Sequence, residues 1–383
     1  MNLARLPFDA ALADYERQAA QLHDGWQRGD AEAVQIVRHS HPKFLRPDVP
    51  WLPKDLSDEE VRAMRVDVTD ARLAIARWYD FAEWQSLREY VDAVTAPGSA
   101  VYRFESAVEA VVEGDLATLG SLLGDHPDLI RARSTRITHF DPPRHRATLL
   151  HYLAANGVEG YRQRTPRNAV AVARLLLEAG AEVDAVADLY GGECTTMSLL
   201  VSSCHPANAG LQVALVDTLV DFGADVEPRG SGSWTSPLLT ALAFGYRDAA
   251  EALVRRGARV NSLAAAAGLG RLDDARRLLP DASGENRHRA LALAAQLGHV
   301  EIVRLLLEAG EDPNRYNPEG NHGHSTPLHQ AALAGHEAVV RLLVDRGARL
   351  DIRDTIYNGT PLGWALYGER PAIADYLRAQ GAA

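Results

Sequence analysis

The chain has 383 residues, of which 40 are Lys or Arg and 51 are Asp or Glu, so its formal net charge is −11. This acidity argues against nucleic acid as a partner, because polyphosphate repels a negatively charged protein. No apolar run approaches the roughly 18 residues of a membrane span, and the N-terminus lacks the apolar core of a secretory leader. Two cysteines, Cys194 and Cys204, cannot form a disulfide framework, which favours a reducing cytoplasm.

Residues 1–96 are predicted to form an N-terminal helical domain. Apolar residues recur at steps of three and four from Phe8 to Trp26, and a second stripe of this kind runs from Trp84 to Val94. The connection between the two stripes contains several prolines, which no helix could cross. The prolines are Pro42, Pro47, Pro50 and Pro53. The segment TAPGSA at residues 95–100 marks the expected boundary.

From residue 101 onward a helix-turn-helix unit recurs. Its clearest copy, TPLHQAALAGHEAVVRLLVDRGA from Thr326, has a capping Thr, a Pro at the first helical position, two apolar stripes and a closing Gly347. One such unit cannot bury its apolar face alone, so neighbouring copies are expected. Equivalent starts fall near Glu105, Thr148, Thr195, Ser236, Asn261, Arg289, Thr326 and Thr360.

The pattern T-P-L-H…A-A…G-H…L-L…G-A resembles the ankyrin repeat. The resemblance implies an all-α fold, an ankyrin-repeat solenoid of about eight helix-turn-helix units over residues 101–383, capped by the helical domain of residues 1–96. Within it, residues 101–235 are atypical and residues 236–383 are near consensus. The segment 146–225 also resembles a group of bacterial ankyrin-repeat proteins of unknown function. The F-x-x-W-x-x-L string that starts at Phe81 resembles a helical module seen in front of bacterial ankyrin arrays.

Two of the atypical units carry insertions. Thr148 to Gly180 is 32 positions and Thr195 to Gly223 is 28, whereas the plain unit from Thr326 to Gly347 is 21. The additions VEGYRQRTPRN and CHPANAGLQ fall between the two helices of their units, so we expect them side by side on one edge. Insertions of this kind often lie on a binding face, although drift in a tolerant loop is the alternative.

The first insertion and the long loop before it, the first finger, which runs from about Leu129 to Ala147, are rich in arginine. Eight arginines and two acidic residues between Arg131 and Arg167 give a local charge of about +6. This favours an anion-binding site, with a solvated basic loop as the alternative. The predicted ligand-binding residues are Arg146, Tyr152, Asn156, Tyr161, Arg162 and His145. Replacing Arg146 and Arg162 by alanine is predicted to leave the melting temperature nearly unchanged, as surface changes do.

Most of the notable histidines occupy consensus positions, where the resemblance implies that the imidazole bonds to loop backbone and ties neighbouring repeats. These are His151, His205, His299, His329 and His336. A metal site of His139, Asp141 and His145 is conceivable by residue type, but the spacing fits no pattern and nearby arginines would repel a cation. No metal or cofactor is therefore predicted.

Two functions from different classes remain open. The sequence lacks G-x-S-x-G, G-K-[ST] and H-E-x-x-H motifs, so no enzyme activity is assigned. The leading interpretation is a cytoplasmic binding module whose concave face, formed by fingers and inner helices, binds another protein. Trp234 and Trp364 are candidate anchors, and packing between fingers accounts for them equally well. The alternative is a binder of an anionic small molecule, or an enzyme, with a pocket formed by the atypical repeats and their inserted loops.

Overall fold

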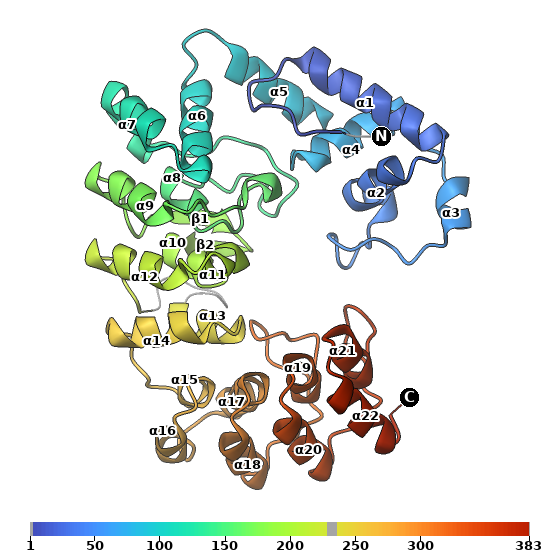
Figure 1. The fold of residues 1–383 in the computed structure, drawn as a ribbon, viewed down its shortest axis with the longest axis vertical. Coiled ribbons are helices and arrows are strands. Elements are labelled where there is room, and N and C mark those ends of the chain that lie inside the picture. Colours follow the sequence, from blue (N-terminus) through green and yellow to red (C-terminus); the bar gives the residue numbers. More distant parts are fainter. Residues whose placement is uncertain (1–2, 228–235, 383) are drawn as a thin grey trace. The chain divides into compact units, whose positions relative to one another are not determined.

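The computed structural model describes residues 3–227 and 236–382 (Figure 1). Within these residues the chain is helical apart from one short β-hairpin. It divides into two units, Met1–Leu211 (unit 1) and Gln212–Ala383 (unit 2). The predicted boundary at residues 95–100 falls inside unit 1, and the predicted domain division stays a prediction. Trp234 lies outside the described residues.

The N-terminal part of unit 1 is a group of helices around one apolar core. They are α1 (Leu12–Gln27), α2 (Ala31–Ser40), the 3-10 turn η1 (Pro42–Phe44), α3 (Asp58–Ala63), α4 (Val68–Trp78) and α5 (Trp84–Thr95). Both predicted amphipathic stripes are confirmed, because Tyr15 and Leu22 of α1 and Leu87 of α5 are buried in this core. Pro42 begins η1, and the residues up to Pro53 form the predicted irregular connection. The predicted capping role of this region stays a prediction.

The remainder of unit 1 contains the atypical helix pairs. Its elements are α6 (Ala100–Glu113), α7 (Leu116–Asp125), η2 (Pro127–Arg131), α8 (Leu149–Tyr152), η3 (Gly160–Arg162), α9 (Ala169–Glu178), β1 (Val186–Leu189), β2 (Gly192–Thr195), α10 (Thr196–Leu200) and α11 (Cys204–Asn208). The antiparallel hairpin β1–β2 turns at Tyr190 and Gly191, which both have positive φ, as a two-residue hairpin turn requires. The glycine pair Gly191-Gly192 is typical of a turn, whereas no pattern in the sequence predicts the paired strands.

The two insertions begin side by side, as predicted. The Ser203 hydroxyl donates to the carbonyl of Ala155 (3.1 Å), and the Asn156 amide donates to the Ser202 hydroxyl (2.8 Å). The first insertion carries η3, and the second contains the helix α11, where a loop was expected. His205 lies in α11 and therefore does not occupy the turn position that the repeat pattern implied.

Unit 2 is a stack of helix pairs. Its helices are α12 (Gln212–Asp221), α13 (Pro237–Ala243), α14 (Arg247–Arg255), α15 (Leu263–Gly268), α16 (Leu272–Leu278), α17 (Gly284–Leu297), α18 (Val300–Glu308), α19 (Pro327–Ala334), α20 (Glu337–Asp345), α21 (Pro361–Tyr367) and α22 (Pro371–Ala379). The inner helices α15, α17, α19 and α21 form one row and the outer helices α16, α18, α20 and α22 a second row (Figure 1). Leu291, Leu328 and Val340 belong to the core between the rows.

One start position differs from its prediction. The apolar pattern places a unit start near Arg289, but α17 begins at Gly284, because the Ser283 hydroxyl accepts from the Asn286 amide and caps the helix earlier. The number of repeats stays a prediction.

The other consensus histidines tie neighbouring helix pairs together, which confirms what the repeat pattern implied. His329 accepts at Nδ1 from the Thr326 amide (3.3 Å) and donates from Nε2 to the carbonyl of Gly359 (3.2 Å). His151 makes the corresponding bonds, and His299 donates to the carbonyl of Gly268 (3.0 Å). The Nδ1 bonds cap the helix that carries each histidine, whereas the Nε2 bonds join one helix pair to the next and satisfy a backbone carbonyl.

Two glycines that follow helices of unit 2 provide a test of this stacking. Gly298 and Gly347 both have positive φ, and a Cβ on Gly298 would lie 2.6 Å from His336 Nδ1, whereas a Cβ on Gly347 would meet nothing within 4 Å. We expect Gly347→Ala to cost about 1 to 2 kcal/mol of backbone strain. Gly298→Ala should cost at least about 1 kcal/mol more, since the His336 ring must move away from its bond to Gln296. Urea unfolding of both variants measures the difference, and equal losses would contradict the expectation.

Candidate functional site

Four charged side chains and one histidine are buried together in unit 1, and we call these five residues the buried charge cluster. They are Glu105, Arg136, His145, Glu159 and Arg162, each at most 1% exposed. Arg162 Nη2 lies 2.7 Å from Glu105 Oε2, and Arg136 Nη2 lies 2.9 Å from the same oxygen. On the other side, Glu159 Oε1 lies 3.2 Å from His145 Nε2 and 3.6 Å from Arg136 Nε. The cluster joins α6, the first finger and the first insertion.

The charges of the cluster keep one another ionised. Burial alone would raise the pKa of the Glu105 carboxyl, but Arg136 and Arg162 outweigh burial and lower that pKa below its ordinary value. The pKa of Glu159 is lowered in the same way. Burial opposes the charge of Arg162, yet chiefly Glu105 raises the pKa of its guanidinium well above the ordinary value. Each charge is therefore stable only because its partners are present.

The first finger and the first insertion also hold the N-terminal helices. The Gly160 amide donates to Asp80 Oδ2 (2.8 Å), and the Ala82 amide donates to the carbonyl of Ile137 (3.0 Å). The ring of Tyr161 lies 5.1 Å from the Arg5 guanidinium and makes an edge contact with the Tyr79 ring, 6.1 Å away. The insertion thus forms an internal contact between the turn after α4 and the atypical repeats.

The predicted ligand-binding residues divide into two groups. His145, Tyr152, Tyr161 and Arg162 lie together, with the Arg162 guanidinium 5.3 Å from the Tyr161 ring and 6.0 Å from the Tyr152 ring. Arg146 is exposed, and its carbonyl accepts from Arg133 (3.0 Å). Asn156 accepts instead from the Tyr190 hydroxyl (2.6 Å). That these residues bind a ligand stays a prediction.

The expectation that Arg162 can be removed without loss of stability is corrected by its environment. Its side chain is 0% exposed and lies 2.9 Å from Glu109 in addition to its two partners in the cluster. Runs of arginine in a sequence do not distinguish a solvated loop from a buried ion-pair network, because two of the three carboxylates that face Arg162 come from α6, far away along the chain. Arg146, in contrast, remains a surface side chain.

Unit 2 presents a row of ring side chains that we call the aromatic surface. It comprises Phe244, His322, His324, Tyr357 and Trp364. The His324 ring lies 6.0 Å from the His322 ring, 6.0 Å from the Tyr357 ring and 5.7 Å from the Trp364 ring. His322 extends the row to α13, where its ring lies 6.2 Å from Phe244. Only Trp364 of this row was singled out from the sequence.

Two fingers hold the aromatic surface in place. The finger of residues 311–325 crosses to α13, where His322 Nε2 donates to the carbonyl of Ala243 (2.7 Å). In the next finger, Asp354 accepts from the amides of Tyr357 and Gly359 and from the Trp364 indole (2.9 Å). The Tyr357 side chain nevertheless remains 60% exposed, and Tyr367 at the end of α21 is 87% exposed. The fingers are therefore held by hydrogen bonds, while the Tyr357 ring keeps apolar area accessible.

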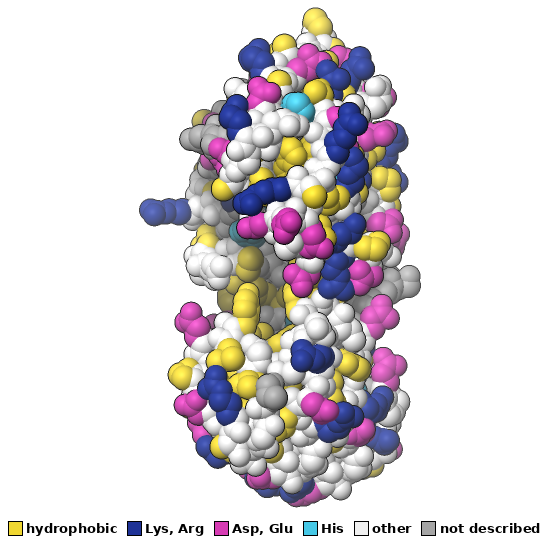
Figure 2. Space-filling model, turned by 90° about the vertical axis from the view of Figure 1, so that its right-hand side faces the viewer, with side chains coloured by type: hydrophobic (Ala, Val, Ile, Leu, Met, Phe, Trp, Pro, Cys, Tyr) yellow, Lys and Arg dark blue, Asp and Glu magenta, His cyan; other side chains and the backbone are white. Residues whose placement is uncertain are grey.

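Among the described residues, no group of three or more His, Cys, Asp or Glu side chains is arranged to hold a metal ion. No helix in the described parts of the chain has the length and apolar character needed to cross a membrane. Figure 2 shows basic and acidic side chains interspersed over the visible face of the molecule.

Comparisons with known proteins place the repeat pattern in a family. The family described as "Ankyrin repeats (many copies)" matches residues 291–344 and 328–378. The "Ankyrin repeat and SAM domain-containing protein 6" of Mus musculus is 42% identical over 74 residues, which are 19% of this chain and 8% of that protein. Its Rattus norvegicus counterpart is 39% identical over 74 residues, with the same coverage. The matched segment thus spans less than a tenth of these relatives.

Solved structures are also similar to this chain. The crystal structure of human ASB11 ankyrin repeat domain aligns with a TM-score of 0.37 and 22% sequence identity, over 72% of this chain and 98% of that one.

Proposed function

We propose that this chain, whose residues 291–378 are ankyrin repeats, is a module that binds another protein at the aromatic surface of unit 2. Ankyrin repeats generally mediate protein–protein interactions. The observation that carries the proposal is the exposure of Tyr357, which the row of rings supports, together with the exposure of Tyr367 at the end of α21, the helix that carries Trp364. Exposed aromatic side chains held rigidly are the groups that most often dominate the free energy of protein binding.

The aromatic surface combines fingers with inner helices, the elements expected to form a concave binding face. His322 and Tyr357 come from two successive fingers, and Trp364 comes from α21. Asp354 already fixes the finger that carries Tyr357. Little conformational freedom of this finger would therefore be lost on binding, and this favours affinity. We place this function in the cytoplasm, as the small number of cysteines favours.

Replacing Tyr357 and Tyr367 together by serine should remove the partner while the protein stays folded. Both side chains are mostly exposed, so the free energy of unfolding should change by no more than about 0.5 kcal/mol per residue. The loss of two anchoring rings should weaken binding at least about tenfold. The measurement is a quantitative pull-down from cognate lysate, followed by titration calorimetry with the recovered partner.

Tyr102→Ser is the matched control for this experiment, since Tyr102 is 43% exposed on α6 of unit 1. The control should retain the partner. Equal capture by the wild-type protein and the double variant would contradict the proposal. A wild-type protein that is folded and monomeric but recovers no stoichiometric partner from the lysate would also contradict the proposal.

The second candidate is an anionic small molecule bound at the atypical repeats. It has less support, because Arg162 already faces three carboxylates. The exposed Arg144, Arg146 and Arg167 favour it, since they make no ion pair with any residue that the structure describes. A thermal-shift screen of carboxylates, phosphates and nucleotides tests it, because a ligand at a hundred times its Kd adds about 2.7 kcal/mol of stability.

A further inference from the structure

A hollow of about 330 Å³ lies next to the aromatic surface in unit 2. Its lining includes Arg247, Gln296, Leu297, Gln330, Leu333 and His336. Gln296 connects the hollow with the aromatic surface, because its amide donates to the carbonyl of Ala243 (2.8 Å) and lies 3.5 Å from His322 Nε2. Gly245, which follows Phe244 in the chain, also lines the hollow.

Two uncompensated arginines border this hollow. Arg247 begins α14 and lines it directly, and Arg370, which precedes α22, donates from Nε to the carbonyl of Leu333 (3.1 Å) on its rim. Both side chains are exposed, and neither forms an ion pair with a carboxylate of the described residues. Their sequence neighbours Asp248 and Glu369 are exposed as well and do not pair with them.

Other arginines in or next to the outer helices pair with carboxylates, unlike Arg247 and Arg370. Arg256 pairs with Asp221, and Arg341 lies 2.7 Å from Glu337. At the hollow, burial is the main cause that lowers the pKa of His336, and the charges of Arg247 and Arg370 lower it further. The hollow is therefore a positively charged place on an otherwise acidic chain.

From this arrangement, and resting on the proposed function, we infer that the partner presents an acidic segment with apolar side chains interspersed. Carboxylates of the segment pair with Arg247 and Arg370, and its apolar side chains pack on Phe244 and Leu333 beside the aromatic surface. Arginine suits this task, because its planar guanidinium donates two parallel hydrogen bonds to one carboxylate. A nucleic acid would offer negative charge too, but the net charge of −11 opposes its approach to the chain as a whole.

Selection of peptides from a random phage-display library for binding to the 383-residue chain tests this inference. Selected peptides should be enriched in Asp and Glu together with apolar residues. Their affinity, measured by fluorescence anisotropy of synthetic copies, should fall at least about tenfold in the variant Arg247→Glu/Arg370→Glu, because both attractions become repulsions. The affinity should also fall as the salt concentration rises.

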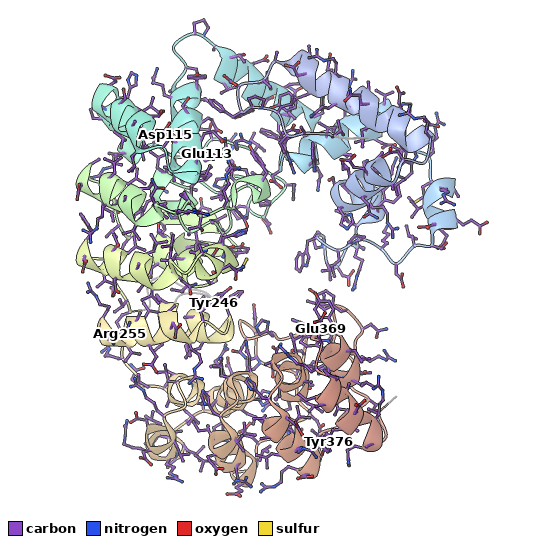
Figure 3. All side chains as sticks on the ribbon, in the orientation of Figure 1. Glu113, Asp115, Tyr246, Arg255, Glu369 and Tyr376 are labelled. Atoms are coloured by element: carbon purple, nitrogen blue, oxygen red, sulfur yellow. The ribbon has the colours of Figure 1, made fainter. Side chains whose placement is uncertain are left out.

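The control variant is Arg255→Glu/Arg378→Glu. Arg255 and Arg378 lie in the last turns of α14 and α22, whereas Arg247 and Arg370 lie at the starts of these helices (Arg255 and Glu369 are labelled in Figure 3). The net charge of both double variants is the same, and the control should bind the selected peptides as the wild-type protein does. Arg247→Glu alone is the second test variant, because only the backbone amide of Arg247 donates a hydrogen bond to a described residue, at the carbonyl of Gly245 (3.1 Å), and the loss of its exposed side chain should not affect folding.

Each outcome bears on either the inference or the proposed function. The selected peptides could instead be neutral or basic, bind the variant Arg247→Glu/Arg370→Glu with unchanged affinity, and require Tyr357 and Tyr367. That result would overturn the acidic partner and leave the proposed function standing. A library that yields no binder, with the protein folded, would count against both. Tighter binding of oligothymidylate than of any selected peptide, with the same dependence on Arg247, would replace the acidic peptide by nucleic acid.

Discussion

Replacing Arg162 by glutamine should lower the free energy of unfolding of unit 1 by about 3 to 5 kcal/mol, the usual cost of removing one partner from a buried ion-pair network. The substitution leaves the carboxylates of Glu105, Glu109 and Glu159 with one positive charge fewer. Glu105 and Glu159 are at most 1% exposed, so water cannot take the place of the guanidinium. Denaturant unfolding followed by circular dichroism measures the loss, and amide hydrogen exchange locates it in unit 1.

Arg164→Gln is the matched control, two positions further along the chain. Arg164 is 47% exposed and pairs with Glu109 and with Glu113, which is labelled in Figure 3 at the end of α6. Exposed ion pairs contribute little, so this variant should lose no more than about 1 kcal/mol. If Arg162→Gln were as stable as the control, the buried charge cluster would not hold the insertion in place.

The second large effect is a loss of stability in mild acid that depends on His151. Burial lowers the pKa of the His151 imidazole from 6.5 to about 4. The folded state therefore resists a proton that the unfolded state takes up, and stability is present above about pH 6.5 and is lost as the pH falls toward 4. A difference of this size corresponds to about 3 kcal/mol over that window.

His151→Gln isolates this contribution. Glutamine at this position can still bond back to the Thr148 amide as part of a capping box, but it does not titrate. The variant should be somewhat less stable at pH 7.5, because it loses the bond from His151 Nε2 to the carbonyl of Cys194. Its free energy of unfolding should then change by about 3 kcal/mol less than that of the wild-type protein between pH 6.5 and pH 4.

His39→Gln serves as the control for the pH experiment, because His39 is exposed on α2 of the same unit. It should leave the pH profile of the wild-type protein unchanged. A profile of His151→Gln that runs parallel to that of the wild-type protein would show that His151 does not take part in the acid response.

The sequence by itself determined the helix pairs and their local contacts. Capping residues such as Thr326, apolar stripes at helical spacing and the closing glycine at Gly347 act within a few residues of one another, so their effects can be predicted from adjacent positions. The roles of His151 and His329 were predictable for a related reason. Each bonds to the cap of its own helix and to the next repeat, and the repeat pattern places both.

Only the tertiary structure decided which polar and aromatic groups are buried and which are exposed. The environment of Arg162 depends on carboxylates of α6, which lie more than fifty positions earlier in the chain. No periodicity in the sequence encodes that meeting, so an internal ion-pair network and a solvated basic loop look alike. The aromatic surface likewise joins rings of α13, two fingers and α21, which come together only because the helix pairs stack. Burial and charge pairing depend on long-range packing, whereas caps and stripes depend on the local chain.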